Sequence, residues 1–544
     1  MFDFDEFMIE CRSSKFIFSS FLFVLLAGGL LPRICAFPMA TPLRGSVPNT
    51  RWPGATLTWD ELRSMGSHLS ANANAAATTS SSSLTSSSSS FFVPLPPRPT
   101  LTSPSPSPSP PPVDPARVRQ DDSALTRLLH RGVLTGGYIN ALLGFADGGP
   151  GAARVGAPRG GKRGGRSNSN SNSSRSRNRR SAAPPPRMDP HAAAIEHLRQ
   201  PRWDFAKEGL SSPDLAEEEA ARAARQRKKK TPEEVARGGI VSVRMAWGNA
   251  AEAAALRSLA KALSSSKEKG KEYEGLFRRG GGKEEETVVS LEEVGMLMVS
   301  DDSLKELLLG GGSSSGTLPF PLPPLAASPD ALARHSSGSG IGSGEGEEAE
   351  GVKAKASSFV EPVEVKCVCP FRLVGRNSAR RAGGRAFDGD GSGGGGVSSS
   401  NNPFARFELS DPGPRPLPPA SAMPQLQLQM LACGSPSALL VSHSATRGGR
   451  VWRVARDDAF LKNMLLVASR VFQENVLAKK EPPVPPKTGG SSSSSSSQTQ
   501  TQHAAGVEAV MRLADAAVAI AAGAQEVALL PPLEGVDPGR AFLQ

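Results

Sequence analysis

The chain has few of the residues that usually build a large compact core. Only 5% of its 544 residues are aromatic, whereas Gly (56) and Pro (47) are abundant and long Ser runs recur. Segments of this composition cannot bury enough apolar surface to offset the entropy lost on ordering, so we expect much of the chain to be disordered. The composition therefore predicts one folded domain that is split by insertions.

Cysteine is also scarce, and no two cysteines have CxxC spacing. Cys11 and Cys35 lie near the N-terminus, which leaves Cys367, Cys369 and Cys433 for the rest of the chain. An odd number of cysteines without such spacing indicates neither a disulfide framework nor a zinc site. We interpret Cys367 and Cys369 as buried strand residues and not as ligands.

An apolar run near the N-terminus predicts a signal peptide over residues 1–36. The run from Phe16 to Leu31 follows basic residues and precedes small residues at Cys35 and Ala36. This is the layout of a signal peptide, and the run is short for a membrane-spanning helix. We therefore expect no stable membrane association once this segment has been removed.

Acidic residues are nearly absent from the stretch that follows. Only Asp60 and Glu61 lie between Phe37 and Pro112, among many Ser, Thr and Pro residues. This composition is typical of a transit peptide, and we assign residues 37–118 to a transit peptide and a Ser/Pro-rich linker. The Ala36-Phe37-Pro38 junction resembles the presequence of algae with secondary plastids. That resemblance implies import into the plastid (chloroplast), with the secretory pathway as the alternative.

The charge balance is basic, with a net charge of +11 and a pI of about 9.6. Such a balance fits a polyanionic partner such as nucleic acid, but it also fits a chain with solvated basic tails. Two basic stretches, 153–187 and 225–230, have both interpretations. We favour solvated inserts for both, with non-specific phosphate contact as the alternative.

Short apolar blocks alternate with Gly/Ser-rich stretches after residue 119 and predict an α/β fold. We expect strands at 287–290, 359–368, 437–442 and 450–454, and a helix that begins at Asp457 and runs to about Leu477. We expect another helix, with a packing or oligomer role, from Ala504 to Leu530. The domain would cover 119–480, with disordered inserts at about 150–235, 264–284, 310–316, 335–357 and 376–402. A linker (481–503) and a C-terminal helix and tail (504–544) would follow.

The segment from Val363 to Cys367 combines a carboxylate with an ammonium. Residues two apart share one face of a strand, so Glu364 and Lys366 should project together while Val363, Val365 and Cys367 face the other layer. A carboxylate beside an ammonium can hold a divalent metal and orient a water. A surface ion pair is the commoner use of an E-x-K pattern and stays open as the alternative.

A second carboxylate follows a proline in Ser328-Pro329-Asp330. Pro329 cannot donate to a sheet ladder, so we expect Asp330 at a strand start or a bend. The Gly/Ser/Glu-rich stretch 336–351 would loop out, which leaves two adjacent strands and brings Asp330 toward Glu364. Two carboxylates, a backbone carbonyl and waters suit Mg²⁺. A simple turn is the alternative.

A third carboxylate, Glu252, lies on a helical stripe that is otherwise apolar. The stripe continues through Leu256, Leu259 and Leu263. A buried glutamate is costly unless it is paired or bound to a metal. The alternative is an exposed first helical turn, where the helix dipole favours acids.

A glutamine-rich helix begins near Pro424. Gln425 and Gln429 share one helix face, while Gln427 points nearly opposite. A glutamine beside a metal site can hold a phosphate or an attacking water. The alternative is an ordinary polar face.

The order of these motifs resembles the YqaJ/lambda-exonuclease family of phage-type recombination exonucleases, within the PD-(D/E)xK nucleases. The matching positions are Gly248, Glu252, Ser328-Pro329-Asp330, Glu364-Val365-Lys366, Gln425, Gln427 and Met430. Residues Gly132 to Gly137 resemble the family's opening element, although Gly137 stands where the family has serine. The resemblance implies a restriction-endonuclease-like PD-(D/E)xK core, a mixed central sheet flanked by helices.

The resemblance also implies an activity: a nuclease, with Mg²⁺ (or Mn²⁺) as cofactor, that hydrolyses phosphodiester bonds of DNA in repair or recombination. Glu252, Asp330, Glu364 and the carbonyl of Val365 would hold the metal, Lys366 would position or deprotonate the attacking water, and Gln425 would support them. The residues expected to contact DNA are Arg131, Thr135, Ser328 and Gln427.

Three alternatives stay open at this point. The protein could be an exonuclease, which the resemblance favours, or an endonuclease. It could be a monomer or a homo-oligomer. It could cleave DNA or only bind it. A catalytically inactive nuclease-fold DNA-binding protein would keep the same core and the basic inserts. A mostly disordered secreted protein, whose motif order arose by chance, is a further reading.

Overall fold

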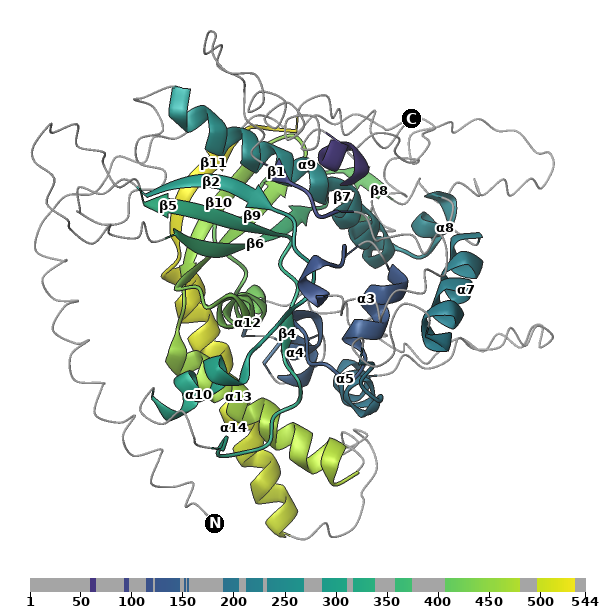
Figure 1. Cartoon of the computed structure of the whole chain (residues 1–544), viewed down its shortest axis with the longest axis vertical. Helices are drawn as coiled ribbons and strands as arrows, with labels where there is room; N and C mark the ends of the chain where they lie inside the picture. Colours follow the sequence, from purple (N-terminus) through teal and green to yellow (C-terminus); the bar gives the residue numbers. More distant parts are fainter. Residues whose placement is uncertain are drawn as a thin grey trace, which may run out of the picture. The chain divides into compact units, whose positions relative to one another are not determined.

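The computed structural model describes residues 59–64, 92–96, 114–120, 123–146, 151–152, 154–155, 189–204, 212–227, 232–268, 286–310, 317–337, 358–373, 407–479 and 497–533. All of them belong to one unit, Val47–Gln544. Its centre is a mixed seven-stranded sheet with helices packed against it (Figure 1). The prediction of an α/β fold with a mixed central sheet flanked by helices is confirmed.

The central sheet has the strand order β1-β2-β5-β6-β9-β10-β11. Its strands are β1 (Phe92–Val93), β2 (Glu286–Glu292), β5 (Ala331–Ser337), β6 (Ser358–Val368), β9 (Ser437–Ser444), β10 (Gly448–Ala455) and β11 (Gln525–Leu530). The pairs β1–β2 and β6–β9 are parallel, and the other neighbouring pairs are antiparallel. The four strand predictions fall inside β2, β6, β9 and β10 and are confirmed.

The two faces of the sheet carry different helices. Helix α9 (Ile240–Glu268) packs its apolar stripe, including Leu256 and Leu259, against Val363 and Val365 of β6. The opposite face packs against α12 (Met423–Cys433), α13 (Asp458–Val471) and α14 (Ser497–Ala522). The period-two alternation of β6 therefore turns Val363 and Val365 toward α9 and Glu364 toward α12, as the sequence predicted.

The remaining elements surround this core. The helices are α3 (Ser123–His130), α4 (Gly136–Leu142), α5 (Pro190–Arg199), α7 (Pro213–Arg227), α8 (Pro232–Arg237) and α10 (Asp301–Leu309). Two small antiparallel sheets pair β3 (Leu297–Met298) with β4 (Ala326–Ala327), and β7 (Phe371–Leu373) with β8 (Phe407–Leu409). No helix among the described residues is long and apolar enough to span a bilayer.

The helix that follows β10 begins as predicted. The side chain of Asp457 accepts a hydrogen bond from Phe460 N at 2.8 Å, which satisfies one of the free donors of the first turn. Phe460, Leu461 and Met464 are buried on the side that faces the sheet. After Val471 the helix widens into a π-type segment, Phe472–Leu477, so the predicted end near Leu477 is also confirmed.

The predicted C-terminal helix is wrong over its last residues. Helix α14 ends at Ala522, and Gln525–Leu530 form strand β11 along β10. Ala528 and Leu530 are buried in the α9-side cluster, because the open edge of β10 offers both backbone partners and apolar contact. Tertiary pairing here overrides the helical tendency of an Ala-rich segment.

Several described segments lie outside the domain limits expected from the sequence, or inside its expected inserts. Residues 59–64, 92–96 and 114–118, assigned to the presequence and linker, pack in the fold. The interval 150–235 contains α5 and α7, because Ile195, Leu198 and Leu215 reach buried clusters. The signal peptide (1–36), most of the other predicted inserts and residues 481–496 of the predicted linker (481–503) lie outside the described residues. The end of that linker was predicted wrongly, because residues 497–503 belong to α14.

A buried carboxylate network ties β5, β6, β9 and β10 together on the α9 side. Glu361 Oε2 lies 2.7 Å from His335 Nε2 and 2.9 Å from Arg453 Nη2, and Ser437 Oγ donates to Glu361 Oε1. Burial alone would raise the pKa of Glu361. The histidine, the arginine and the hydroxyl outweigh burial and lower the pKa to about 2.

This network predicts a loss of stability in acid. The folded pKa of Glu361 lies below its ordinary value of 4.5, so its stabilisation is complete above pH 4.5 and is lost as the pH falls toward 2. Between these limits the wild type should lose about 3 kcal/mol more free energy of unfolding than Glu361→Gln. Urea unfolding of both proteins across this range measures the difference, and parallel curves would contradict the prediction.

Candidate active site

Four separate elements bring the predicted site residues together at one end of the central strands. Glu252 comes from α9, Asp330 from the turn before β5, Glu364 and Lys366 from β6, and Gln425 from α12. Each element places its residue for a local reason.

Asp330 occupies the bend that the sequence predicted, directly before β5. Its backbone N donates to Val363 O at 2.9 Å, and its Oδ2 accepts from Val365 N at 2.6 Å. Gln120 Nε2 donates to the carbonyl of Pro329 at 2.6 Å and so fixes the turn from the other side. The carboxylate of Asp330 is therefore held against β6, one residue from Glu364.

Glu364 is buried in the middle of the sheet, with 3% of its surface exposed. Its Oε1 is paired with Lys366 Nζ, and its Oε2 accepts from Gln429 Nε2 at 2.7 Å. Gln425 contacts Lys366 instead, with 3.3 Å between Nζ and Oε1. Of the two glutamines on one face of α12, Gln429 therefore binds Glu364 and Gln425 binds Lys366. Gln429 was not among the predicted site residues, although its i+4 spacing places it on the same face as Gln425.

The carboxyl groups of the site lie close together, and burial and their mutual repulsion raise the pKa values of Glu252 and Asp330. Burial, and next the charge of Glu364, raise the pKa of Glu252 to about 7. Burial, Glu364 and Glu252 raise the pKa of Asp330 well above its usual range. Burial would lower the pKa of Lys366, but the carboxylates, Glu364 first, outweigh it and hold that pKa above its ordinary value. Three carboxyl groups thus face one ammonium, and without a cation the protonated forms of Glu252 and Asp330 are favoured.

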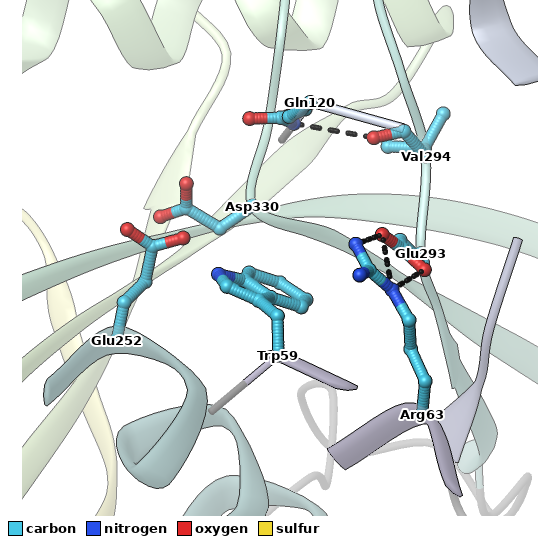
Figure 2. Close-up of a pocket in the computed structure, with 7 residues that line it drawn as sticks. All are labelled: Trp59, Arg63, Gln120, Glu252, Glu293, Val294 and Asp330. Atoms are coloured by element: carbon cyan, nitrogen blue, oxygen red, sulfur yellow. Dashed lines mark hydrogen bonds and ion pairs between the residues drawn. The ribbon is translucent and has the colours of Figure 1, made fainter. Parts of the chain in front are cut away.

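The carboxylates of Glu252 and Asp330 point toward one another (Figure 2). They border a cavity of about 30 Å³, which has room for about one water-sized ligand. Hard oxygen donors of this kind match the chemistry of Mg²⁺ or Mn²⁺. No three His, Cys, Asp or Glu side chains among the described residues form a group that could hold a metal ion in this structure. Both oxygens of Glu364 have protein partners, Lys366 and Gln429.

The same cavity is lined by residues that the sequence did not indicate. The indole nitrogen of Trp59 is turned toward the carboxylates of Glu252 and Asp330, and Arg63 forms an ion pair with Glu293 (Figure 2). Both Trp59 and Arg63 belong to a short helix, residues 59–64, inside the interval assigned to the presequence. The sequence analysis missed them because the surrounding segment is poor in acids and rich in Ser and Thr, which is typical of a transit peptide.

Thr135, one of the predicted DNA contacts, precedes the glycine that approaches Gln425, and Ser328 lies three residues after the bridge partner of Leu134. Thr135 begins α4, and a Cβ on the next residue, Gly136, would lie 2.6 Å from Gln425 Cγ, so this position requires glycine. Leu134 pairs with Leu325, which brings Ser328 to the same region. The hydroxyl of Ser328 is buried without a hydrogen-bond partner among the described residues.

The other two predicted DNA contacts are engaged elsewhere. Arg131 Nη1 lies 2.9 Å from Asp214 Oδ2, so its charge is paired with α7. Gln427 is completely buried. Its Nε2 donates to Ala455 O and its Oε1 accepts from Asp457 N, both at 2.9 Å. Gln427 therefore holds α12 to the end of β10, and we do not retain it as a ligand contact.

Comparison with protein-family models, with curated proteins and with solved structures finds no match for this chain.

Because Gln429 and Gln425 bind different partners, we expect their substitution by leucine to lower the free energy of unfolding by different amounts. Gln429→Leu removes the donor to a carboxylate oxygen that water cannot reach, and should lower the free energy of unfolding by about 1–3 kcal/mol. Gln425→Leu, one turn earlier, leaves Glu364 with both partners and should cost less than about 1 kcal/mol. Urea unfolding at neutral pH checks both, and equal losses would argue against the assignment.

Proposed function

We propose that this chain is a divalent-cation-dependent nuclease that hydrolyses phosphodiester bonds of DNA. The observation that carries the proposal is that Glu252, Asp330 and the Glu364–Lys366 pair come from three separate elements and lie close enough to interact electrostatically. Glu252 and Asp330 also line the same cavity. Their order in the chain is the order that resembles the YqaJ/lambda-exonuclease family. Chance placement of the motifs would not bring their side chains together.

The sheet supports a PD-(D/E)xK core. Asp330 ends the turn before β5, the E-x-K residues lie on β6, and these two strands are antiparallel neighbours. On its other side β6 pairs in parallel with β9, with Lys366 opposite Ser442. A carboxylate at the start of one strand and an E-x-K pair on the next is the arrangement that this core requires.

Glu252 and Asp330 would hold Mg²⁺ or Mn²⁺, with Glu364 and the carbonyl of Val365 as further oxygen donors. When bound, such a cation supplies Lewis-acid stabilisation of the charge that develops on the phosphodiester oxygens. The crowding of carboxylates supports this proposal, because a cation would relieve the repulsion between Glu252, Asp330 and Glu364.

The remaining residues would orient the reaction. Lys366 would position or deprotonate the attacking water. Without a cation, the carboxylates around it, Glu364 first, outweigh burial and raise its pKa above the ordinary value. Gln425 holds Nζ on one side and Glu364 holds it on the other. Gln429 keeps the Glu364 carboxylate in place while Lys366 acts.

We propose DNA as the partner, in repair or recombination, with Thr135 and Ser328 as contacts. The buried and unpartnered Ser328 hydroxyl supports a polar ligand at that position. The plastid stays the proposed compartment on the strength of the predicted signal peptide (1–36) and transit peptide and linker (37–118), most of which lie outside the described residues. Exonuclease action and a homo-oligomer stay proposals drawn from the resemblance.

Cleavage assays with the full chain test the proposal. With Mg²⁺, wild type should cleave linear DNA, EDTA should stop it, and Glu364→Ala and Lys366→Ala should each lower the rate by about 100-fold or more. Glu196→Ala, an exposed carboxylate on α5, serves as the matched control and should cleave like wild type.

Undiminished cleavage by both site variants would exclude this site assignment. DNA binding without cleavage by the wild type would favour the catalytically inactive alternative. Closed circular DNA and RNA, run beside linear DNA, separate endonuclease from exonuclease action and DNA from RNA specificity.

A further inference from the structure

Three exposed arginines come from three segments that meet near the carboxyl ends of β6 and β9. Arg244 is on α9, which packs against β6 and β7 (Figure 1). Arg415 lies in the loop between β8 and α12, and Arg447 lies in the turn between β9 and β10. All three are exposed residues. We call Arg244, Arg415 and Arg447 the arginine cluster.

The two loops that carry Arg415 and Arg447 are fastened to each other. Asp411 Oδ1 accepts from Gly413 N at 2.8 Å, and Asp411 Oδ2 accepts from Thr446 N at 3.0 Å. The side chain of Arg447 lies against Gly413, where an added Cβ would be 3.1 Å from Arg447 Cδ. The two guanidinium groups are therefore carried by loops whose backbone is held by hydrogen bonds.

Arg244 belongs to the same cluster because its charge acts on Arg415. Partial burial of the guanidinium, and next the charge of Arg244, lower the pKa of Arg415. Arg244 also interacts electrostatically with Cys369, directly after β6, and so does Asp411. The three segments thus gather positive charge in one place, at an energetic cost that an anion would offset.

The carboxylates of this region do not neutralise the arginine cluster. Glu408 is paired with Arg372, and Asp411 is engaged by backbone donors of the two loops. In the part of the chain that the structure describes, none of the three clustered arginines forms an ion pair with a carboxylate. Their charges are therefore available to an anion from outside the protein.

The arginine cluster adjoins Lys366 of the candidate active site. Lys366 lies opposite Ser442 in the parallel pairing of β6 with β9, about 4.8 Å away across one strand spacing. Ser442 Oγ in turn accepts a hydrogen bond from Arg415 N at 3.1 Å. The side chain of Lys366 is 40% exposed. A phosphate chain that reached Lys366 would therefore continue onto Arg415.

We propose that Arg244, Arg415 and Arg447 bind the phosphate backbone of DNA beside the point of cleavage. A guanidinium group presents a fork of N–H donors that matches phosphate oxygens, and its binding releases the counterions condensed on DNA. Such contacts hold DNA in position and do not depend on its base sequence. This inference rests on the proposed function and adds the surface by which the same site would hold its substrate.

The salt dependence of DNA binding by the full chain tests the inference. Anisotropy of a fluorescent linear duplex, recorded in EDTA, measures affinity without cleavage. Each phosphate contact adds about 0.9 to the slope of log affinity against log salt concentration, so R244Q/R415Q/R447Q should lower that slope by about 2 to 3. At low salt its affinity should fall about 100-fold.

Cleavage in Mg²⁺ supplies a second readout. The arginines would hold DNA without taking part in the chemical step. R244Q/R415Q/R447Q should therefore raise KM for DNA about tenfold or more and leave kcat at saturating DNA within about twofold of wild type.

A second triple variant, R127Q/R154Q/R470Q, removes the same charge elsewhere. These arginines have exposed side chains that are paired with Glu218, Asp515 and Glu474, respectively. Charges away from the bound DNA are screened over about 10 Å, so this variant should keep an affinity within about threefold of wild type.

The outcomes distinguish this inference from the proposed function. DNA affinity and salt slope of R244Q/R415Q/R447Q equal to wild type, with cleavage by both, would overturn the inference and leave the nuclease proposal standing. Equal losses in the two triple variants would also overturn it, because net charge alone would explain them. The expected loss of slope, with no cleavage by wild type, would support the arginine surface and overturn the nuclease. A wild type that binds no DNA at low salt would overturn both.

Discussion

The burial of a carboxylate in the middle of the central sheet is the constraint on which the rest of the site depends. Glu364 lies on an inner strand with almost no access to water, so its two oxygens need partners from the protein. Lys366 supplies one from the same strand face, and Gln429 supplies the other from α12. The position of α12 against β6 is therefore tied to this one charge, and the close approach of Gly136 to Gln425 ties α4 to α12 in turn.

The parts of the site that follow from local geometry could be predicted from the sequence. The alternation of β6 placed Glu364 and Lys366 opposite the valines, Pro329 placed Asp330 at the start of a strand, and the leucine stripe of α9 turned Glu252 inward. Each of these depends only on a repeat of two or 3.6 residues, or on a missing backbone donor. The strand or helix alone then decides where the side chain points.

The parts that depend on packing between distant segments could not be predicted. Arg63 and Glu293 are 230 residues apart, and nothing near Arg63 in the sequence indicates a buried partner. Gln425 and Gln429 share a face, but the position of α12 along β6 decides which of them reaches Glu364. Likewise β11 became a strand because β10 had an open edge, which an Ala-rich sequence does not reveal.

The seven strands lie side by side in the same order in which the chain supplies them. A stretch between two of them, such as 338–357 between β5 and β6, therefore joins elements that are already neighbours. The partners of each strand are set by pairing among the described strands, so a change in the length of such a connection need not change any strand partner. Insertions or deletions between strands can therefore change the length of the chain while Asp330 and Glu364 stay next to each other.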